Sequence, residues 1–447
     1  MKEVRSMLRE EDIAIDLKCQ QYICKSYMRN LEGTESVLLF ESKQKTEDVF
    51  CPFCHGPVHI CDMTEKALKD IPIWKGIQQY LHFNCHRYRC TQCGRKHTEE
   101  IPLKYPGTRI TERAAAWIHS LLLNKVSIKS IQNITGIHWE TIRNIHIKLM
   151  ESTLQEHHKE LKEKGYQPQY LAVDEFAIHK GHTYATCVMD LETGEALWVG
   201  KGRSKEDFKK FFDEIEPSFL ANIKAVAMDM NASYHILVQE KLPQAQIVYD
   251  RYHIQAQYGK DVLGVVRLNE ARKHKAISKE LSAQLADQSP EDKREMKKQI
   301  QAEKQQYNKI KKLRWTLLTN GEKLTETQHS DMQGILEKHS SLAVCYAMKE
   351  ELVSLFRLRD PHEAEVGWRK WFKAAKESEI PALVHFAELK ERRLNGLIAH
   401  AQYPISTGKL EGFNNKIKVA KRVGYGFRDD HYFFLLVKSL SSSPRNP

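Results

Sequence analysis

The sequence predicts a multidomain protein of mixed α+β and α/β class. Its parts are an N-terminal zinc-ribbon-like module, a helix-turn-helix, a mixed β-sheet and a large all-helical segment. Three observations support this class: six of the ten cysteines lie between positions 51 and 93, strand-like runs dominate from 170 to 250, and the pattern from about 255 to 400 is helical. At about 150 residues per domain, a chain of 447 residues has room for several units.

The chain is basic, with 69 Lys and Arg against 58 Asp and Glu, a formal charge of +11 and a pI near 9.0. This balance is typical of proteins that bind polyanions, and a basic protein without such a partner is the alternative. No run of 18 apolar residues occurs, and the charged N-terminus lacks a signal-peptide core. We therefore expect a soluble, cytoplasmic protein.

Two C-x2-C pairs, 51-CPFC-54 and 90-CTQC-93, predict a structural zinc site. Each pair can form a tight knuckle that directs both sulfurs at one tetrahedral ion, and 79–90 is expected to be a strand that returns the chain to the metal. Four thiolates leave no open position for catalysis. The expected ligands are Cys51, Cys54, Cys90 and Cys93. A disulfide or unconnected thiols are the alternatives, and an expected ligand has four possible replacements nearby: Cys61, Cys85, His55 and His86.

The segment 127-SIKSIQNITGIHWETIRNIHIKLM-150 predicts a DNA-binding helix-turn-helix. One helix is expected from Ser127 to about Thr135, a break at Gly136, and a second helix from about 138 with Ile142 and Ile145 inward. Any short helical hairpin with a glycine turn has the same pattern, which is the alternative. In the DNA-binding interpretation, the residues that face the major groove are His138, Glu140, Thr141, Arg143 and Asn144.

From 168 the periodicity predicts strands at 170–178, 184–190 and 195–200, then a helix at 204–215, a strand at 223–230, a helix at 232–242 and a strand at 246–250. Ser204 and Asp207 are expected to form a capping box. An antiparallel meander followed by alternating helices and parallel strands indicates a mixed α/β sheet.

Two aspartates, Asp174 and Asp229, lie at the ends of apolar strands of this sheet. Each alone is more often a turn or cap residue. If the strands are neighbours, however, the two carboxylates converge, repel each other and need a cation between them. Glu411 is the candidate third ligand, since 409-KLEGFNNKIKVAKRV-423 has helical spacing with Phe413 and Ile417 on one side. The face of Glu411 also carries the candidate phosphate contacts Asn414, Asn415, Lys418 and Arg422.

Three acids that hold Mg²⁺ or Mn²⁺ are typical of phosphodiester chemistry. No Walker, GxSxG or GxGxxG motif occurs, so the sequence lacks the motifs that ATP-driven chemistry and serine hydrolysis require. The basic stretch 267–314 either lies on phosphates or forms a solvated helix face.

The order of these motifs, with VDEFAIHKGHTYATCVMD, VAMDMNASYHILVQEKLPQAQIVYDRYHI and STGKLEGFNNKIKVAKRVGYGFRD, resembles the ISL-three family of bacterial insertion-sequence transposases over essentially the whole chain. The resemblance implies a ribonuclease-H-like core of the DDE type, interrupted by a helical insertion, and an N-terminal zinc module that helps bind element ends. It also implies that Asp174, Asp229 and Glu411 hold two Mg²⁺ ions. Asp250 and His253 match a family signature and are expected near the site, while Tyr252 replaces the usual phenylalanine.

The expected function is therefore DNA cleavage and strand transfer at the element's terminal inverted repeats, with duplex DNA as partner, a dimer during reaction and a location at the bacterial nucleoid. A catalytically silent DNA-binding regulator and a ribonuclease-H-like nuclease without strand transfer are the alternatives. The expected division is 1–104 for the zinc module, 105–165 for the helix-turn-helix, 166–254 and 401–447 for the two parts of the core, and 255–400 for the helical insertion.

Overall fold

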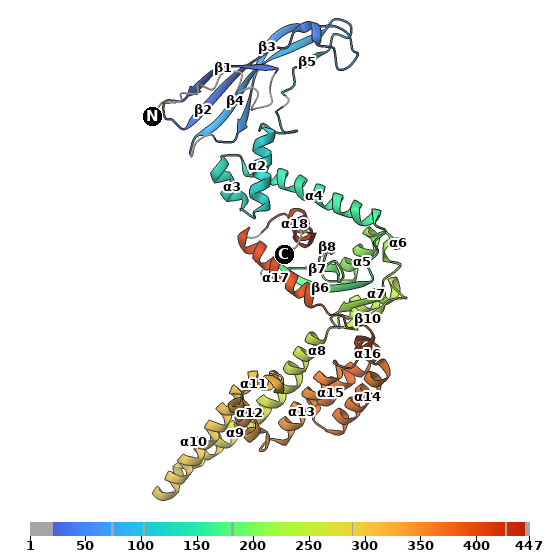
Figure 1. Ribbon diagram of the computed structural model, residues 1–447. Helices are drawn as coiled ribbons and strands as arrows, with labels where there is room; N and C mark the ends of the chain where they lie inside the picture. The colour runs from blue at the N-terminus through green and yellow to red at the C-terminus, as the bar shows by residue number, and fades with distance from the viewer. Residues whose placement is uncertain are drawn as a thin grey trace, which may run out of the picture. The chain divides into compact units, whose positions relative to one another are not determined.

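The fold comes from a computed structural model, which describes residues 21–72, 76–101, 103–179, 183–287, 289–424 and 427–442 (Figure 1). The chain forms two compact units. The first comprises residues 1–160 and 420–439, and the second comprises residues 161–419 and 440–447. Both units contain helices and a mixed sheet, which confirms the predicted mixed α and β class.

The sheet of the first unit has the order β1-β2-β4-β3, with β5 on β4. β2 and β4 are parallel and the other pairs are antiparallel. Every second residue of β4 is buried over most of its length, as expected for a strand with one face on a core. The expected strand at 79–90 is confirmed. The elements are β1 (Tyr22–Arg29), β2 (Glu35–Ser42), η1 (Thr46–Asp48), β3 (Val58–Asp70), β4 (Gln78–Cys90) and β5 (Lys96–Thr98).

Helices follow this sheet in the chain, and the predicted hairpin around Gly136 is present. The Ser127 hydroxyl caps α3 by accepting from the Ser130 N–H, and Gly136 ends the helix with φ +64°, a conformation that favours glycine. Ile142 and Ile145 are buried, as predicted. The helices are α2 (Glu112–Leu123), α3 (Ile128–Thr135), α4 (Trp139–Glu163) and, near the C-terminus, α18 (Asp430–Ser442).

The sheet of the second unit has the order β10-β9-β6-β7-β8. β6, β7 and β8 form an antiparallel meander, and β9 and β10 run parallel to β6, which confirms the predicted topology. β9 is buried throughout, as is usual for a central parallel strand, and it is shorter than the predicted 223–230. The strands are β6 (Tyr170–His179), β7 (Thr183–Asp190), β8 (Ala196–Lys201), β9 (Ala225–Met228) and β10 (Gln246–Tyr249).

The first helix packed with this sheet, α5, begins where its cap predicts. Ser204 and Asp207 form both hydrogen bonds of a capping box at the start of α5. The helices packed with this sheet are α5 (Lys205–Glu214), α6 (Pro217–Leu220), α7 (Ala232–Lys241) and α17 (Gly408–Val423).

Between β10 and α17 the described chain is helical apart from short connections, as predicted for the insertion (Figure 1). Its aromatic core includes Tyr258, Trp368, Trp371 and Phe386. None of the helices in the described ranges has both the length and the apolar composition needed to cross a bilayer. The insertion contains α8 (Arg251–Tyr258), the π-helical η2 (Gly259–Leu263), α9 (Gly264–Gln284), η3 (Leu285–Asp287), α10 (Pro290–Lys312), α11 (Arg314–Leu318), η4 (Gly321–Lys323), α12 (Glu326–Leu336), α13 (Ser340–Leu355), α14 (Pro361–Glu377), α15 (Pro381–Glu391) and α16 (Leu394–Gln402).

Candidate active site and metal centre

Asp174 and Asp229 lie at the same level of two neighbouring parallel strands. Val173 of β6 pairs with Met228 of β9, and each aspartate is the next residue in its chain. Asp174 continues β6, whereas Asp229 is the first residue after β9. The strand pairing therefore brings together two acids that are 55 positions apart in the sequence.

The acidity of Asp174 reflects this crowding. The pKa of Asp174 is raised from 3.8 to about 6, chiefly by burial, and the negative charges of Asp229 and Glu175 contribute to this rise. The backbone N–H of Glu175 and the nearby His253 act in the opposite direction. A carboxyl that ionises this reluctantly gains a large favourable interaction when a cation enters beside it.

Asn414 brings α17 to the same end of the sheet. Its Nδ2 donates a hydrogen bond of 2.9 Å to Oδ2 of Asp174, across 240 positions of sequence. Glu411 lies three positions earlier on α17 and therefore occupies the adjacent turn of the same helix face. Its side chain is exposed, and its backbone N–H bonds to the Thr407 carbonyl in the first turn.

The three acids do not form a closed ligand cluster. Among the described residues, the only group of three or more candidate ligands whose atoms all lie within 4.8 Å of one another is formed by cysteines. The structure thus places Asp174 and Asp229 on adjacent strands and Glu411 one helical turn from the contact with Asp174, without bringing all three carboxylates together.

The position of Asn414 differs from the surface position that a DNA contact requires. Its side chain is buried and bonded to Asp174, because its side of α17 packs against β6. Its Oδ1 is also buried and has no hydrogen-bond partner among the described residues. Asn415, Lys418 and Arg422 of the same helix are exposed.

Asp250 connects the two ends of the helical insertion. It is 1% exposed and caps α8 by accepting from the N–H groups of Tyr252 and His253. Its other oxygen, Oδ2, accepts from both the N–H and the hydroxyl of Thr407, each at 2.8 Å. The Thr407 carbonyl in turn accepts from the backbone N–H of Glu411 in the first turn of α17. Asp250 therefore supports the segment that carries the third acid.

Sequence reasoning missed two cations of the insertion that hold the loop after Asp229. Arg393 donates to the Met230 carbonyl at 2.6 Å. The Lys390 ammonium contacts the Met230 sulfur at 3.1 Å and donates to Oε1 of Gln257 at 2.5 Å. Burial, with Arg393 nearby, lowers the pKa of Lys390 to about 8. No local pattern marks these residues, because both contacts join segments about 160 positions apart.

Sequence reasoning also missed two polar side chains near the candidate acids, those of Asn231 and Arg203. Asn231 donates its backbone N–H to Asp229 at 2.9 Å and its Nδ2 to Glu175 at 3.2 Å. Arg203 lies 3.8 Å from the same glutamate. Both residues follow the end of a strand, which is the same signal that marks the aspartates.

The four cysteines of the first unit form a compact sulfur cluster. Cys51 and Cys93 have sulfurs 3.6 Å apart, and those of Cys54 and Cys90 are 3.4 Å apart. Hydrogen bonds from the backbone N–H groups of Cys93 and Gln92 lower the pKa of the Cys90 thiol to about 6. Four clustered cysteine sulfurs are suitable ligands for a thiophilic metal ion.

The two C-x2-C knuckles share a backbone conformation. The residue after the second cysteine of each pair, His55 or Gly94, has a positive φ of 57° or 69°, which lets the chain turn back under the sulfurs. The possible replacement ligands lie outside the cluster, including Cys85, which is buried in the core of the sheet beside Tyr22.

The residues predicted to face DNA occupy two environments. His138 and Asn144 are exposed. Arg143 instead forms an ion pair with Asp429, and its guanidinium lies 5.3 Å from the ring centre of Tyr432. The position of Arg143 therefore differs from the predicted one, because α18 and the residues before it bind its side chain.

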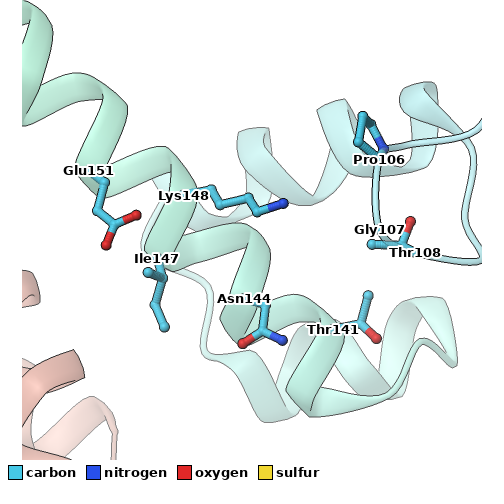
Figure 2. Close-up of a pocket in the computed structure, with 8 residues that line it drawn as sticks. All are labelled: Pro106, Gly107, Thr108, Thr141, Asn144, Ile147, Lys148 and Glu151. Atoms are coloured by element: carbon cyan, nitrogen blue, oxygen red, sulfur yellow. The ribbon is translucent and has the colours of Figure 1, made fainter.

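Thr141 and Asn144 line a pocket of about 330 Å³ on α4. Figure 2 shows them, with Lys148, on the side of α4 that faces the loop before α2. The complete lining is Pro106, Gly107, Thr108, Thr141, Asn144, Ile147, Lys148 and Glu151.

A second pocket, of about 430 Å³, lies between α9 and α10 within the basic stretch 267–314. Three lysines provide its charge, and the other lining residues offer hydroxyl or amide groups. The lining is Lys275, Ser278, Lys279, Ser282, Lys304, Tyr307 and Asn308.

The sequence pattern of a protein family described as transposases matches residues 171–437. The chain belongs to the ISL-three family of insertion-sequence transposases. It is 32% identical over 378 residues to the transposase for insertion sequence element IS1001 of Bordetella parapertussis, which covers 85% of each chain. It is 26% identical over 263 residues to the transposase for insertion sequence element IS1557 of Mycobacterium tuberculosis strain H37Rv, covering 58% of this chain and 56% of that one. The matched region of the transposase contains Asp174, Asp229 and Glu411.

Proposed function

We propose that this transposase binds the terminal inverted repeats of its element and catalyses metal-dependent cleavage and strand transfer at a DDE site formed by Asp174, Asp229 and Glu411. The observation that carries the proposal is the meeting of β6, β9 and α17: adjacent strands bear the two aspartates, and Asn414 joins the helix of Glu411 to Asp174.

The residues present fit a hard divalent cation. Oxygen ligands are what Mg²⁺ and Mn²⁺ require, and the pKa of about 6 for Asp174 reflects a buried carboxyl that lacks a compensating charge. Oδ1 of Asn414, which has no hydrogen-bond partner among the described residues, would be a further acceptor for a water molecule at this position. Two ions held by the three acids would supply activation of the attacking oxygen and stabilisation of the leaving oxygen.

The chain's own groups hold the acids and the DNA. Asp250 positions the start of α17 through Thr407, and Lys390 and Arg393 hold the loop after Asp229. Phosphate contacts are assigned to Asn415, Lys418 and Arg422 and to the lysines of the pocket between α9 and α10, because these groups are exposed cations or amides. Water and then the freed 3′ hydroxyl act as nucleophiles, so the chemistry uses no covalent protein intermediate and no ATP.

The remaining assignments concern the first unit and the architecture. Zinc is the ion that four thiolates at this spacing prefer, and α3 with α4 forms the helix-turn-helix, with His138, Thr141 and Asn144 toward bases. We assign a ribonuclease-H-like core to 166–254 and 401–447 and the insertion to 255–400, because the meander followed by parallel strands has that order. The zinc module takes 1–104 and the DNA-binding helices 105–165. Because the transposase must pair two element ends at the nucleoid, we expect it to act as a dimer.

The test uses purified full-length protein, Mg²⁺ and a duplex that carries the element's terminal repeats. Asp174→Asn, Asp229→Asn and Glu411→Gln should each abolish nicking at the repeat ends while leaving the affinity for the duplex unchanged. Asp213→Asn, an exposed aspartate on α5, is the matched control and should cut at the parental rate. Undiminished cutting by one of the three variants would remove that residue from the site.

The same assay separates the alternatives. Binding without any cutting by the parental protein would indicate a DNA-binding regulator. Cutting without joining of the 3′ ends to a target duplex would indicate a nuclease that lacks strand transfer.

A further inference from the structure

Two histidines of the helical insertion face each other, each held by a glutamate. His274 of α9 and His339, which precedes α13, have Nε2 atoms 3.4 Å apart and rings nearly perpendicular, at 79°. Nδ1 of His274 lies 2.5 Å from Glu303 of α10, and Nδ1 of His339 lies 3.0 Å from Glu270 of α9. The four side chains are mostly buried, the exposed fractions being 19% and 8% for the histidines and 25% and 10% for the glutamates.

The glutamates determine which ring nitrogen carries hydrogen. A carboxylate only accepts hydrogen bonds, so Nδ1 of each ring must donate and Nε2 then presents a lone pair. Glu270 accepts hydrogen bonds from both Lys273 and His339. Lys273 lies 2.7 Å from its Oε1, which leaves Oε2 for His339.

Two neutral rings in this state would bring two lone pairs within 3.4 Å of each other in a largely buried place. This arrangement is unfavourable unless a positive charge lies between the nitrogens. A transition-metal ion bound by two histidines at 2.0–2.1 Å with a tetrahedral angle separates their nitrogens by about 3.4 Å. A carboxylate on the far nitrogen of a metal-binding histidine is also the usual supporting arrangement.

We infer that His274 and His339 bind one divalent transition-metal ion of the zinc, nickel or cobalt class through their Nε2 atoms, with Glu303 and Glu270 as supporting partners and water completing the coordination. Imidazole ligands favour this class over Mg²⁺. The ion would join α9, α10 and the start of α13, the segments from which the four side chains come. This site is separate from the proposed DDE site and does not depend on that proposal.

The experiment uses full-length protein without an affinity tag, loaded with zinc and then dialysed against a weak chelator, which empties a site with two histidine ligands and leaves the cysteine cluster filled. Equilibrium dialysis against Ni²⁺ should show one additional ion per chain. His274→Ala and His339→Ala should each abolish this binding, and Glu303→Gln, which keeps both ligands, should weaken it by about 10–100-fold. His362→Ala changes an exposed histidine on α14 and should bind Ni²⁺ like the parent.

A thermal melt provides a second readout for variants that bind no metal. Ni²⁺ should raise the melting temperature of the parent and of His362→Ala but not of His274→Ala. The inference is overturned if no additional ion binds, or if the stoichiometry stays the same in both alanine variants. It is also overturned if melting responds to pH between 5.5 and 8 through both histidines while Ni²⁺ has no effect, since a shared proton would then occupy the gap.

Discussion

Thr407 donates two hydrogen bonds to one oxygen of Asp250, through its N–H and its hydroxyl, each 2.8 Å long. The two residues are 157 positions apart and lie at the two ends of the helical insertion. Because Asp250 is almost wholly buried, the contact closes the insertion on the sheet and leads directly into the helix of Glu411.

Asp250→Asn should slow DNA cleavage more than it weakens DNA binding. The new NH₂ group, where it replaces Oδ2, cannot accept from Thr407, which leaves buried donors facing each other at a cost of about 1–3 kcal/mol. A displaced α17 should lower the cleavage rate by about 10–100-fold. Chemical denaturation and single-turnover cleavage measure the two effects.

Thr407→Val removes the hydroxyl and keeps the backbone donor. It should therefore lower the free energy of unfolding by about 1 kcal/mol and reduce the cleavage rate. Thr327→Val, at an exposed position on α12, is the control. Equal cleavage rates for the parent and Asp250→Asn would show that Asp250 does not position Glu411.

Lys390→Met should stabilise the protein at pH 7. The pKa of Lys390 falls from 10.5 to about 8 in the folded chain, so keeping the buried ammonium charged costs up to about 3 kcal/mol below pH 8. The lost hydrogen bond to Gln257 offsets part of the gain, and we expect about 1–2 kcal/mol in urea denaturation.

The pH dependence has a definite sign. A base whose folded-state pKa is depressed lowers stability at low pH, and this cost fades as pH rises from 8 to 10.5. The advantage of Lys390→Met should therefore shrink between pH 8 and 10, whereas Lys370→Met, at an exposed lysine, should show no such trend. If the stability advantage of Lys390→Met does not change with pH, Lys390 does not carry a buried charge at neutral pH.

Asn144→Ala should weaken binding to the element's repeats by about 1–3 kcal/mol with little change on unrelated DNA, because Asn144 is exposed on the proposed recognition helix. Lys418→Ala should instead weaken binding to all duplexes and lower the slope of log affinity against log salt by about 1. Fluorescence anisotropy at several salt concentrations measures both. Equal losses for Asn144→Ala on both DNAs would remove it from base recognition.

Purified protein never exposed to chelator should contain about one zinc per chain in the cysteine cluster. Cys93→Ser leaves three thiolates and should lose the metal and destabilise the first unit. Cys61→Ser changes an exposed cysteine outside the cluster and should retain zinc. Metal analysis combined with thermal melting decides the outcome, and an equal zinc content in the parent and in Cys93→Ser would mean that another ligand is used.

The sequence alone determined the features that depend on neighbouring residues. The capping box of Ser204 and Asp207, the helix end at Gly136 and the order of strands and helices follow from local hydrogen bonding and periodicity, and the structure reproduces them. Helical spacing also placed Asn414 on the face of Glu411, because that relation depends only on the pitch of α17.

Only the tertiary structure decided which of these faces are covered. Periodicity could not show that Asn414 is buried against Asp174, that Arg143 pairs with Asp429, or that Lys390 reaches Met230. Each contact joins residues at least 160 positions apart, and its energy depends on packing between elements that local patterns do not relate. Long-range packing therefore sets the surroundings of the acids, while local sequence sets the strands and helix that carry them.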